Sequence, residues 1–210
     1  GGTLLITKEI IGNNCDKINF NNKSVTVQND VKLSGVFYDL IIDGIVTNTS
    51  SVTVRRNFTI NENGNYIANS NKLIFGYNEN LNNDEKENNL SAINGEINVK
   101  IKDLNLGDVI FNAEKIEGVS ENINDVDSNE GQKKLLSDIL AASIVVRNKT
   151  VLDMNGKSVS VTNDISNSGR LLLNNGTLSA NNLTNAGTIN VTGESGTLTT
   201  TGDFVNNSTL

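Results

Sequence analysis

Residues 165–171 (ISNSGRL), 183–189 (LTNAGTI) and 204–210 (FVNNSTL) share one pattern: an apolar residue, any residue, Asn, any residue, a small residue, any residue and a second apolar residue. The first residues of the three segments are 18 and 21 positions apart. A unit of this length cannot bury an apolar face alone, so it must stack on its neighbours. The segments therefore predict a repeat protein with one unit in about every 20 residues.

The residues between these segments alternate between apolar and polar. Apolar side chains stand at every second position in four pairs: Val159 and Val161, Leu171 and Leu173, Leu178 and Ala180, Ile189 and Val191. A period of two is typical of a strand with one buried face. Asn-Gly pairs at 155–156 and 175–176 suit tight turns, because these residues reach positive φ. Coils of short strands stacked about 4.8 Å apart form a parallel β-helix.

The recurring Asn has a physical use at a turn. A side-chain amide can bond the backbone of its own coil and the Asn of the next coil at the same time. We therefore predict a ladder of Asn167, Asn185 and Asn206. The alternative is that Asn recurs only because it is abundant in this chain.

The first part of the chain repeats this material in a less regular form. Residues 18–37 align with 152–171 at a constant offset of 134, without a gap. The identical residues in the first segment are Asn21, Lys23, Ser24, Val25, Val27, Asn29, Asp30, Ser34 and Gly35. The Asn pattern also occurs at residues 46–52 (VTNTSSV). We interpret 1–77 and 144–210 as two blocks of one β-helix, built from the same unit.

Residues 78–143 depart from the repeat. Polar stretches at 78–89 and 121–131 read as loops, and short strand-like pieces lie between them. Leu135, Leu136, Ile139 and Leu140 have the spacing of one helix face, which predicts a helix over about 130–143. The expected fold is thus all-β, a right-handed parallel β-helix with a loop-plus-helix insertion.

Composition excludes several classes of function. The chain has no His, no Pro, no Trp and 4% aromatic residues, which suits a thin core of Val, Ile and Leu. Its net charge of −7 disfavours nucleic acid as a partner. No apolar run is long enough for a transmembrane helix, and the single Cys15 cannot form an internal disulfide. The first residue is not Met and the last lies within a repeat, so we expect a piece of a longer protein.

No catalytic constellation stands out, and we expect no enzyme activity and no cofactor. Without His, and with no neighbour that activates Cys15, nucleophilic catalysis has no support. Asp125, Asp127 and Asn129 resemble the start of a calcium loop, with oxygen ligands at alternate positions. However, Gly131 stands one place late and Leu136 takes the place of the final Glu. The alternative is a solvated loop before the expected helix.

Two sets of residues carry a family resemblance. Residues 150–161 (TVLDMNGKSVSV) look like a coil of the pectin-lyase-like right-handed β-helix superfamily. The repeated ISNSGRL, LTNAGTI and FVNNSTL resemble the passenger domains of autotransporters and filamentous-haemagglutinin-like adhesins, most of all the giant fusobacterial adhesins. The resemblance covers about residues 18–76 and 144–210. It implies an extracellular stalk at the bacterial cell surface, anchored in the outer membrane by a barrel outside this sequence.

The resemblance also implies the expected function: a passenger segment that adheres to a host-cell surface protein or glycan, or to other bacteria. Because loops on a rigid scaffold usually carry recognition, we expect contact at 78–143. Two alternatives stay open. One is a purely structural spacer, and the other is a carbohydrate-active enzyme, which needs acids and bases clustered on one face. A leucine-rich repeat is disfavoured because no fixed leucine frame holds.

Overall fold

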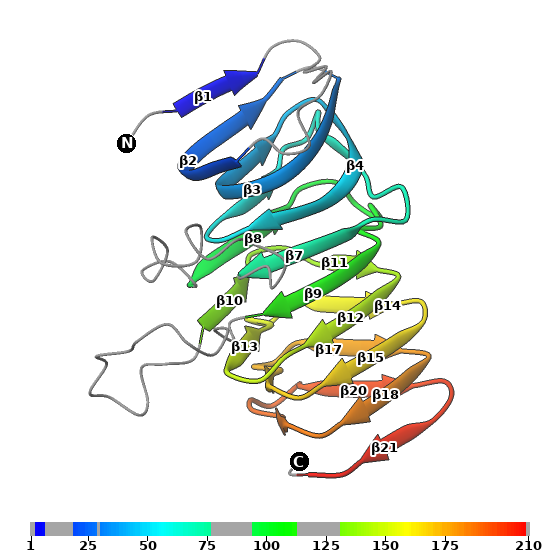
Figure 1. Cartoon of the computed structure of the whole chain (residues 1–210). Helices are drawn as coiled ribbons and strands as arrows, with labels where there is room; N and C mark the ends of the chain where they lie inside the picture. The colour runs from blue at the N-terminus through cyan, green and yellow to red at the C-terminus, as the bar shows by residue number, and fades with distance from the viewer. Residues whose placement is uncertain (1–2, 7–18, 29, 77–93, 113–130, 209–210) are drawn as a thin grey trace, which may run out of the picture.

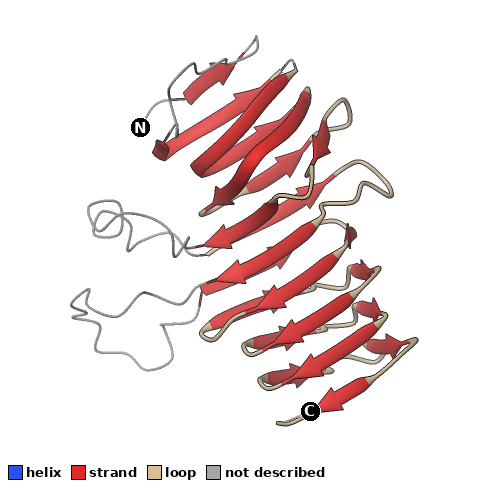
Figure 2. Cartoon of the chain, turned by 45° about the vertical axis from the view of Figure 1, so that its right-hand side comes forward, coloured by secondary structure: helices blue, strands red, loops and turns tan. Residues whose placement is uncertain are grey.

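The chain forms a parallel β-helix, seen in a computed structural model that describes residues 3–6, 19–28, 30–76, 94–112 and 131–208. Strands stack along one axis, with β1 near one end and β21 at the other (Figure 1). Every strand pairing within the described residues is parallel. Figure 2 shows strands connected by short turns and loops, without a helix in the described part.

The strands follow one another in chain order. They are β1 (Thr3–Ile6), β2 (Asn19–Val27), β3 (Val31–Ile42), β4 (Ile45–Val54), β5 (Phe58–Ile60), β6 (Asn65–Ile67), β7 (Lys72–Gly76), β8 (Gly95–Val99), β9 (Asp108–Asn112), β10 (Gly131–Leu135), β11 (Ile139–Ala141), β12 (Ser143–Val146), β13 (Thr150–Asp153), β14 (Ser158–Val161), β15 (Asp164–Asn167), β16 (Arg170–Leu172), β17 (Thr177–Ala180), β18 (Asn182–Asn185), β19 (Thr188–Asn190), β20 (Thr197–Thr200) and β21 (Phe204–Asn206).

Each coil has three faces, which we name in the order that the chain visits them. Face I stacks the last parts of β2 and β3 on β5, β8, β10, β13, β16 and β19. Face II contains the first parts of β3 and β4 with β6, and further along β11, β14, β17 and β20. Face III joins the remaining parts of β3 and β4 to β7, β9, β12, β15, β18 and β21.

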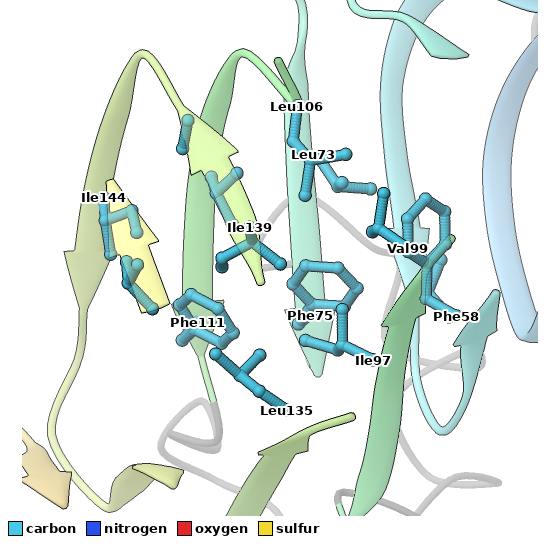
Figure 3. Packing of buried hydrophobic residues seen from close by; sticks show 14 of the residues in the cluster. Phe58, Leu73, Phe75, Ile97, Val99, Leu106, Phe111, Leu135, Ile139 and Ile144 are labelled. Carbon is cyan, nitrogen blue, oxygen red and sulfur yellow. The ribbon is translucent and has the colours of Figure 1, made fainter. Parts of the chain in front are cut away.

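The core lies between the faces and is built of side-chain columns. In the C-terminal coils the apolar part of the core consists of aliphatic residues and Met154. In the earlier coils aromatic rings fill it: Phe75 stacks on Phe111 with ring centroids 5.3 Å apart, and Phe58 meets Phe75 edge-on at 5.5 Å. Figure 3 shows these rings among Ile97, Leu135 and other aliphatic side chains. Within the described residues, the buried aromatic side chains are thus concentrated in the earlier coils.

The predicted alternation is confirmed at seven of its eight positions. Val159, Val161, Leu171, Leu173, Leu178, Ala180 and Ile189 are buried, whereas Val191 is 52% exposed. Val191 follows the end of β19, where the chain leaves face I for an exposed turn before β20. Leu173, at the equivalent position just after β16, is buried, so the end of a strand does not by itself break the alternation.

The predicted Asn ladder is confirmed. The Asn167 Nδ2 donates to the Asn185 Oδ1 at 2.7 Å, and the Asn185 Nδ2 donates to the Asn206 Oδ1 at 2.8 Å. The Asn185 amide also donates to the Gly187 carbonyl at 3.3 Å, within its own corner. Asn167 and Asn185 are almost fully buried. The ladder continues a core column of face III, because the register places Phe37, Val54, Phe75, Phe111 and Val146 in the same column.

The predicted helix over about 130–143 is wrong. This segment forms β10 and β11 and enters β12, with Gly131, Lys133 and Leu135 buried and Gln132 and Lys134 half-buried. That is a period of two. β10 lies between β8 and β13 and bonds to both, and these ladders outweigh the helical spacing of the leucines. Leu136, expected on the buried helix face, is 37% exposed.

The expected insertion over 78–143 is not seen as a separate unit. Residues 94–112 and 131–143 form coils whose strands pair with the blocks on either side. The loops expected at 78–89 and over most of 121–131 lie outside the described residues. In the described part, the scaffold is therefore continuous from β2 to β21.

The sequence match between 18–37 and 152–171 does not place matched residues on the same face. Val25 and Val27 lie on face I. The residues aligned with them in sequence, Val159 and Val161, lie on face II. The Asn pattern also occurs on different faces. Asn48 is the last residue of the face II part of β4, whereas Asn167 is the last residue of the face III strand β15. Both Asn side chains are buried at a corner. The pattern therefore specifies a corner, and stacking decides which corner it becomes.

No helix in the described part of the chain is long and apolar enough to cross a membrane.

Candidate binding groove

Face II is interrupted in the middle of the solenoid. Its strands stop at β6 and resume at β11, and the coil between them passes this face as a bend over residues 100–107. One isolated bridge, between Asn105 and Leu140, links the bend to β11. A hollow lies between this bend and strands β11 and β14.

This hollow is a groove of about 510 Å³. Its lining comes from three consecutive coils and consists of Val99, Lys100, Ile101, Lys102, Asp103, Leu104, Ser137, Asp138, Ile139, Leu140, Lys157, Ser158 and Ser160. A volume of this size lies within the range of about 300–1,000 Å³ typical of small-molecule sites.

The bend that forms one wall is held by apolar anchors and backbone bonds. Ile101 and Leu104 are half-buried and pack against the core. The Lys100 N–H donates to the Ile60 carbonyl at 2.9 Å, and the Leu106 N–H donates to the Leu140 carbonyl at 2.9 Å. These contacts fix the backbone while the side chains of Lys100 and Lys102 remain exposed. Asp103 also remains exposed, at a positive φ of 59°.

The opposite side is fixed by hydrogen bonds between coils. Ser137 Oγ accepts from the Val99 N–H at 2.6 Å, which ties the turn before β11 to the end of β8. Asp138 Oδ1 accepts from the Ser158 N–H at 2.8 Å, which ties the same turn to β14. Ser158 and Ser160 expose their side chains on the outer surface of β14. The groove is therefore preformed and edged with hydroxyl groups.

The charge of the groove differs from that of the chain. Three lysines and two aspartates line it, a formal charge of +1, whereas the whole chain carries −7. One oxygen of Asp138 already accepts the Ser158 N–H. No aromatic side chain is among the lining residues. The groove therefore offers ammonium groups and hydroxyls, with short apolar contacts from residues such as Ile101 and Leu104.

A second group of charges lies inside the solenoid. Lys133 is 1% exposed, and its ammonium donates to the carbonyl oxygens of Arg55 at 2.5 Å and Arg56 at 2.9 Å. Gly95 stands beside Lys133 in the ladder, and a Cβ at Gly95 would overlap the Arg56 carbonyl. The missing side chain lets the backbone of Arg56 lie close to Gly95, next to Lys133 in the sheet.

Burial determines the chemistry of this internal lysine. Desolvation lowers the pKa of Lys133 from 10.5 to about 7, while the nearby Asp39 raises the pKa and Arg56 lowers it further. Asp39 is itself buried and accepts from the Arg56 Nε at 2.8 Å and from the Asn57 N–H at 3.1 Å. Since Lys133 is closed to solvent, it stabilises a corner and does not form a site for a ligand.

The predicted calcium ligands Asp125, Asp127 and Asn129 lie outside the described residues, so calcium binding stays a prediction. Within the described ranges, no group of three or more His, Cys, Asp or Glu side chains is arranged to hold a metal. Asp103 stands in a turn and lines the groove.

Sequence reasoning missed the lysines of the groove. The spacing Lys100, Ile101, Lys102 carries a signal, because an apolar residue between two lysines anchors a segment and directs both charges outwards. The contribution of Lys157, Ser158 and Ser160 had no such signal, since they belong to regular repeat positions in the second block.

Comparison with protein-family models, with curated proteins and with solved structures found no match for the chain. An assignment of function therefore depends on the fold, on the sequence motifs and on the groove.

Proposed function

We propose that the chain is part of the extracellular passenger of a bacterial surface adhesin, a stiff rod that presents the groove to a glycan on a host cell or another bacterium. The fold supports this proposal. Face III runs without a break from β3 to β21, and each coil bonds to its neighbours through parallel ladders. Such a stack carries its surface features at fixed spacing and orientation.

The observation that carries the proposal is the polar groove at the break in face II. Its wall at 99–104 and its turn at 137–140 fall within 78–143, the range in which the sequence predicts contact with a partner. The next coil completes the lining with Lys157, Ser158 and Ser160. Serine hydroxyls both donate and accept, as sugar hydroxyls do. Further along the solenoid, face II exposes three threonine side chains on β17 and β20: Thr177, Thr197 and Thr199.

The experiment compares two substitutions in one column of face II. Ser160→Trp places an indole in the groove, and Thr199→Trp places one on the same outward column two coils away. Both positions are exposed, so both variants should keep the circular dichroism of the parent. Deletion of 78–143, where the sequence predicts contact, is not a usable test. It would remove strands such as β8 and β10, which belong to the stacked coils.

Binding to epithelial cells, to bacteria and to a glycan array is then measured. We expect the parent and Thr199→Trp to bind and Ser160→Trp to lose binding. Equal binding by all three proteins would move the adhesive site away from the groove. Absence of binding by the folded parent would favour a structural spacer. Release of reducing ends from a bound glycan, abolished by Asp138→Asn, would favour an enzyme instead.

A further inference from the structure

We propose that the groove selects an acidic saccharide, one that carries carboxylate or sulfate groups. This inference rests on the proposed function, because it names the class of glycan that the same groove binds. Lys100 and Lys102 approach from the bend on one side, and Lys157 approaches from the turn before β14 on the other. An anionic group between them meets ammonium groups from two separate coils.

The rest of the lining favours a charged sugar over a neutral one. Neutral sugars gain much of their affinity from stacking on aromatic rings, and no aromatic side chain lines this groove. The remaining contacts are hydroxyls and charges. Charge-assisted hydrogen bonds are about twice as strong as neutral ones, so an acidic group supplies the affinity that stacking does not.

The positions of the lysines are fixed on both sides. Lys157 is half-buried, its N–H donates to the Met154 carbonyl at 2.8 Å, and its carbonyl accepts from the Thr177 N–H at 3.2 Å. Lys100 and Lys102 flank Ile101, which packs against the core. Of the two aspartates, Asp138 is held at the rim by the Ser158 N–H. Asp103 stays exposed in the bend, so the three lysines leave the lining with a formal charge of +1.

The charge of the whole chain limits the size of this ligand. At −7 overall, the protein repels a long polyanion, and the local excess of positive charge is confined to the groove. A short acidic oligosaccharide, or the acidic end of a branched glycan, fits this distribution.

Three tetrasaccharides test the proposal by calorimetry on the folded chain: a hyaluronan fragment with carboxylates, a heparin fragment with sulfates as well, and neutral chitotetraose. We expect at least one acidic fragment to bind and chitotetraose not to bind. Lys157→Gln should weaken binding roughly three- to tenfold, and Lys157→Arg should restore it. Lys72→Gln, at the exposed first position of β7 on face III, is the matched control and should have no effect. Affinity should fall as salt rises, since exposed charges are screened.

The outcomes separate this proposal from the function on which it rests. If chitotetraose binds as tightly as the acidic fragments, or if Lys157→Gln binds them as tightly as the parent does, acid selectivity is wrong while adhesion through the groove stands. If cells bind and Ser160→Trp blocks them, yet no acidic fragment binds, the same conclusion follows. If the folded chain binds no cell and no glycan, both proposals fail.

Discussion

The side-chain amide of Asn167 donates to the side-chain oxygen of Asn185 at 2.7 Å, one coil further along the solenoid. The two residues are 18 positions apart and both are buried. Asn185 repeats the arrangement with Asn206 at 2.8 Å. In earlier coils the same column holds Val146 and Phe111, so the core column changes from apolar packing to hydrogen bonding. Each Asn is needed by its neighbours, because a buried amide without partners is costly.

Asn185→Ala should destabilise the fold by about 1–3 kcal/mol, because the buried Asn167 amide loses one of its two acceptors and keeps only the Thr188 carbonyl. Urea unfolding followed by circular dichroism measures the change. Asn163→Ala is the control, since this exposed side chain lies outside the ladder, and it should stay within about 0.5 kcal/mol of the parent. Equal losses for the two variants would show that the ladder adds nothing to stability.

Gly187→Ala should lower the melting temperature more than Gly156→Ala. A Cβ at Gly187 would overlap the backbone carbonyl of Gly169, which belongs to the stacked coil and cannot move alone. Gly156 has a positive φ of 73°, but a Cβ there would meet its nearest atom, the Asn174 carbonyl oxygen, at 3.8 Å. Its substitution therefore costs only backbone strain, about 1–2 kcal/mol. Thermal scans measure the melting temperatures of the two variants. A larger decrease for Gly156→Ala than for Gly187→Ala would contradict the prediction.

The contribution of Lys133 to stability should rise with pH. Its pKa is about 7 in the folded chain and 10.5 when free, so between these values the unfolded chain binds more protons. Stability from this group therefore increases from pH about 7 to pH about 10.5, and below pH about 7 the cost of burying the charge is constant. Lys133→Met removes the titration. The free energy of unfolding of the parent minus that of the variant should grow across this window, and parallel curves would show that Lys133 keeps its ordinary pKa.

Substitution of the two neighbouring charges should move the pKa of Lys133 in opposite directions. Asp39 raises this pKa and Arg56 lowers it, so Asp39→Asn should lower the pKa below about 7 and Arg56→Gln should raise it. The titration is measured by NMR on protein with ¹³C-labelled lysine, from the shift of the Cε next to the ammonium. An unchanged pKa in both variants would mean that desolvation alone controls the lysine, and shifts in the same direction would contradict the prediction.

Local patterns were enough to predict the type of fold and some of its corners. A stacked β-coil is predicted by two features together: the alternation around Val159 and Leu178, and the repeat length of 18 to 21 residues. The Asn155-Gly156 turn has positive φ at both residues, as its sequence suggests. The Asn ladder was predictable because the repeat itself places Asn167, Asn185 and Asn206 in register.

The helix over about 130–143 was mispredicted because local spacing cannot report partners. Leu135 and Leu136 fit a helix face in isolation, but the strands on either side of β10 bond to every part of it. Lys133 was hidden for a related reason. Its ammonium bonds to carbonyls that are 77 and 78 positions away in the chain.

The sequence by itself determined the repeating coil, the alternation of buried and exposed side chains and the Asn corners, because these depend on contacts between equivalent positions of neighbouring repeats. Only the tertiary structure decided which face each segment occupies, where face II breaks and which residues form the groove. Lys102, Asp138 and Ser160 meet there because three coils stack in a particular register. Register is a property of the whole stack, set by side-chain packing and backbone ladders between coils, and no short stretch of sequence specifies it.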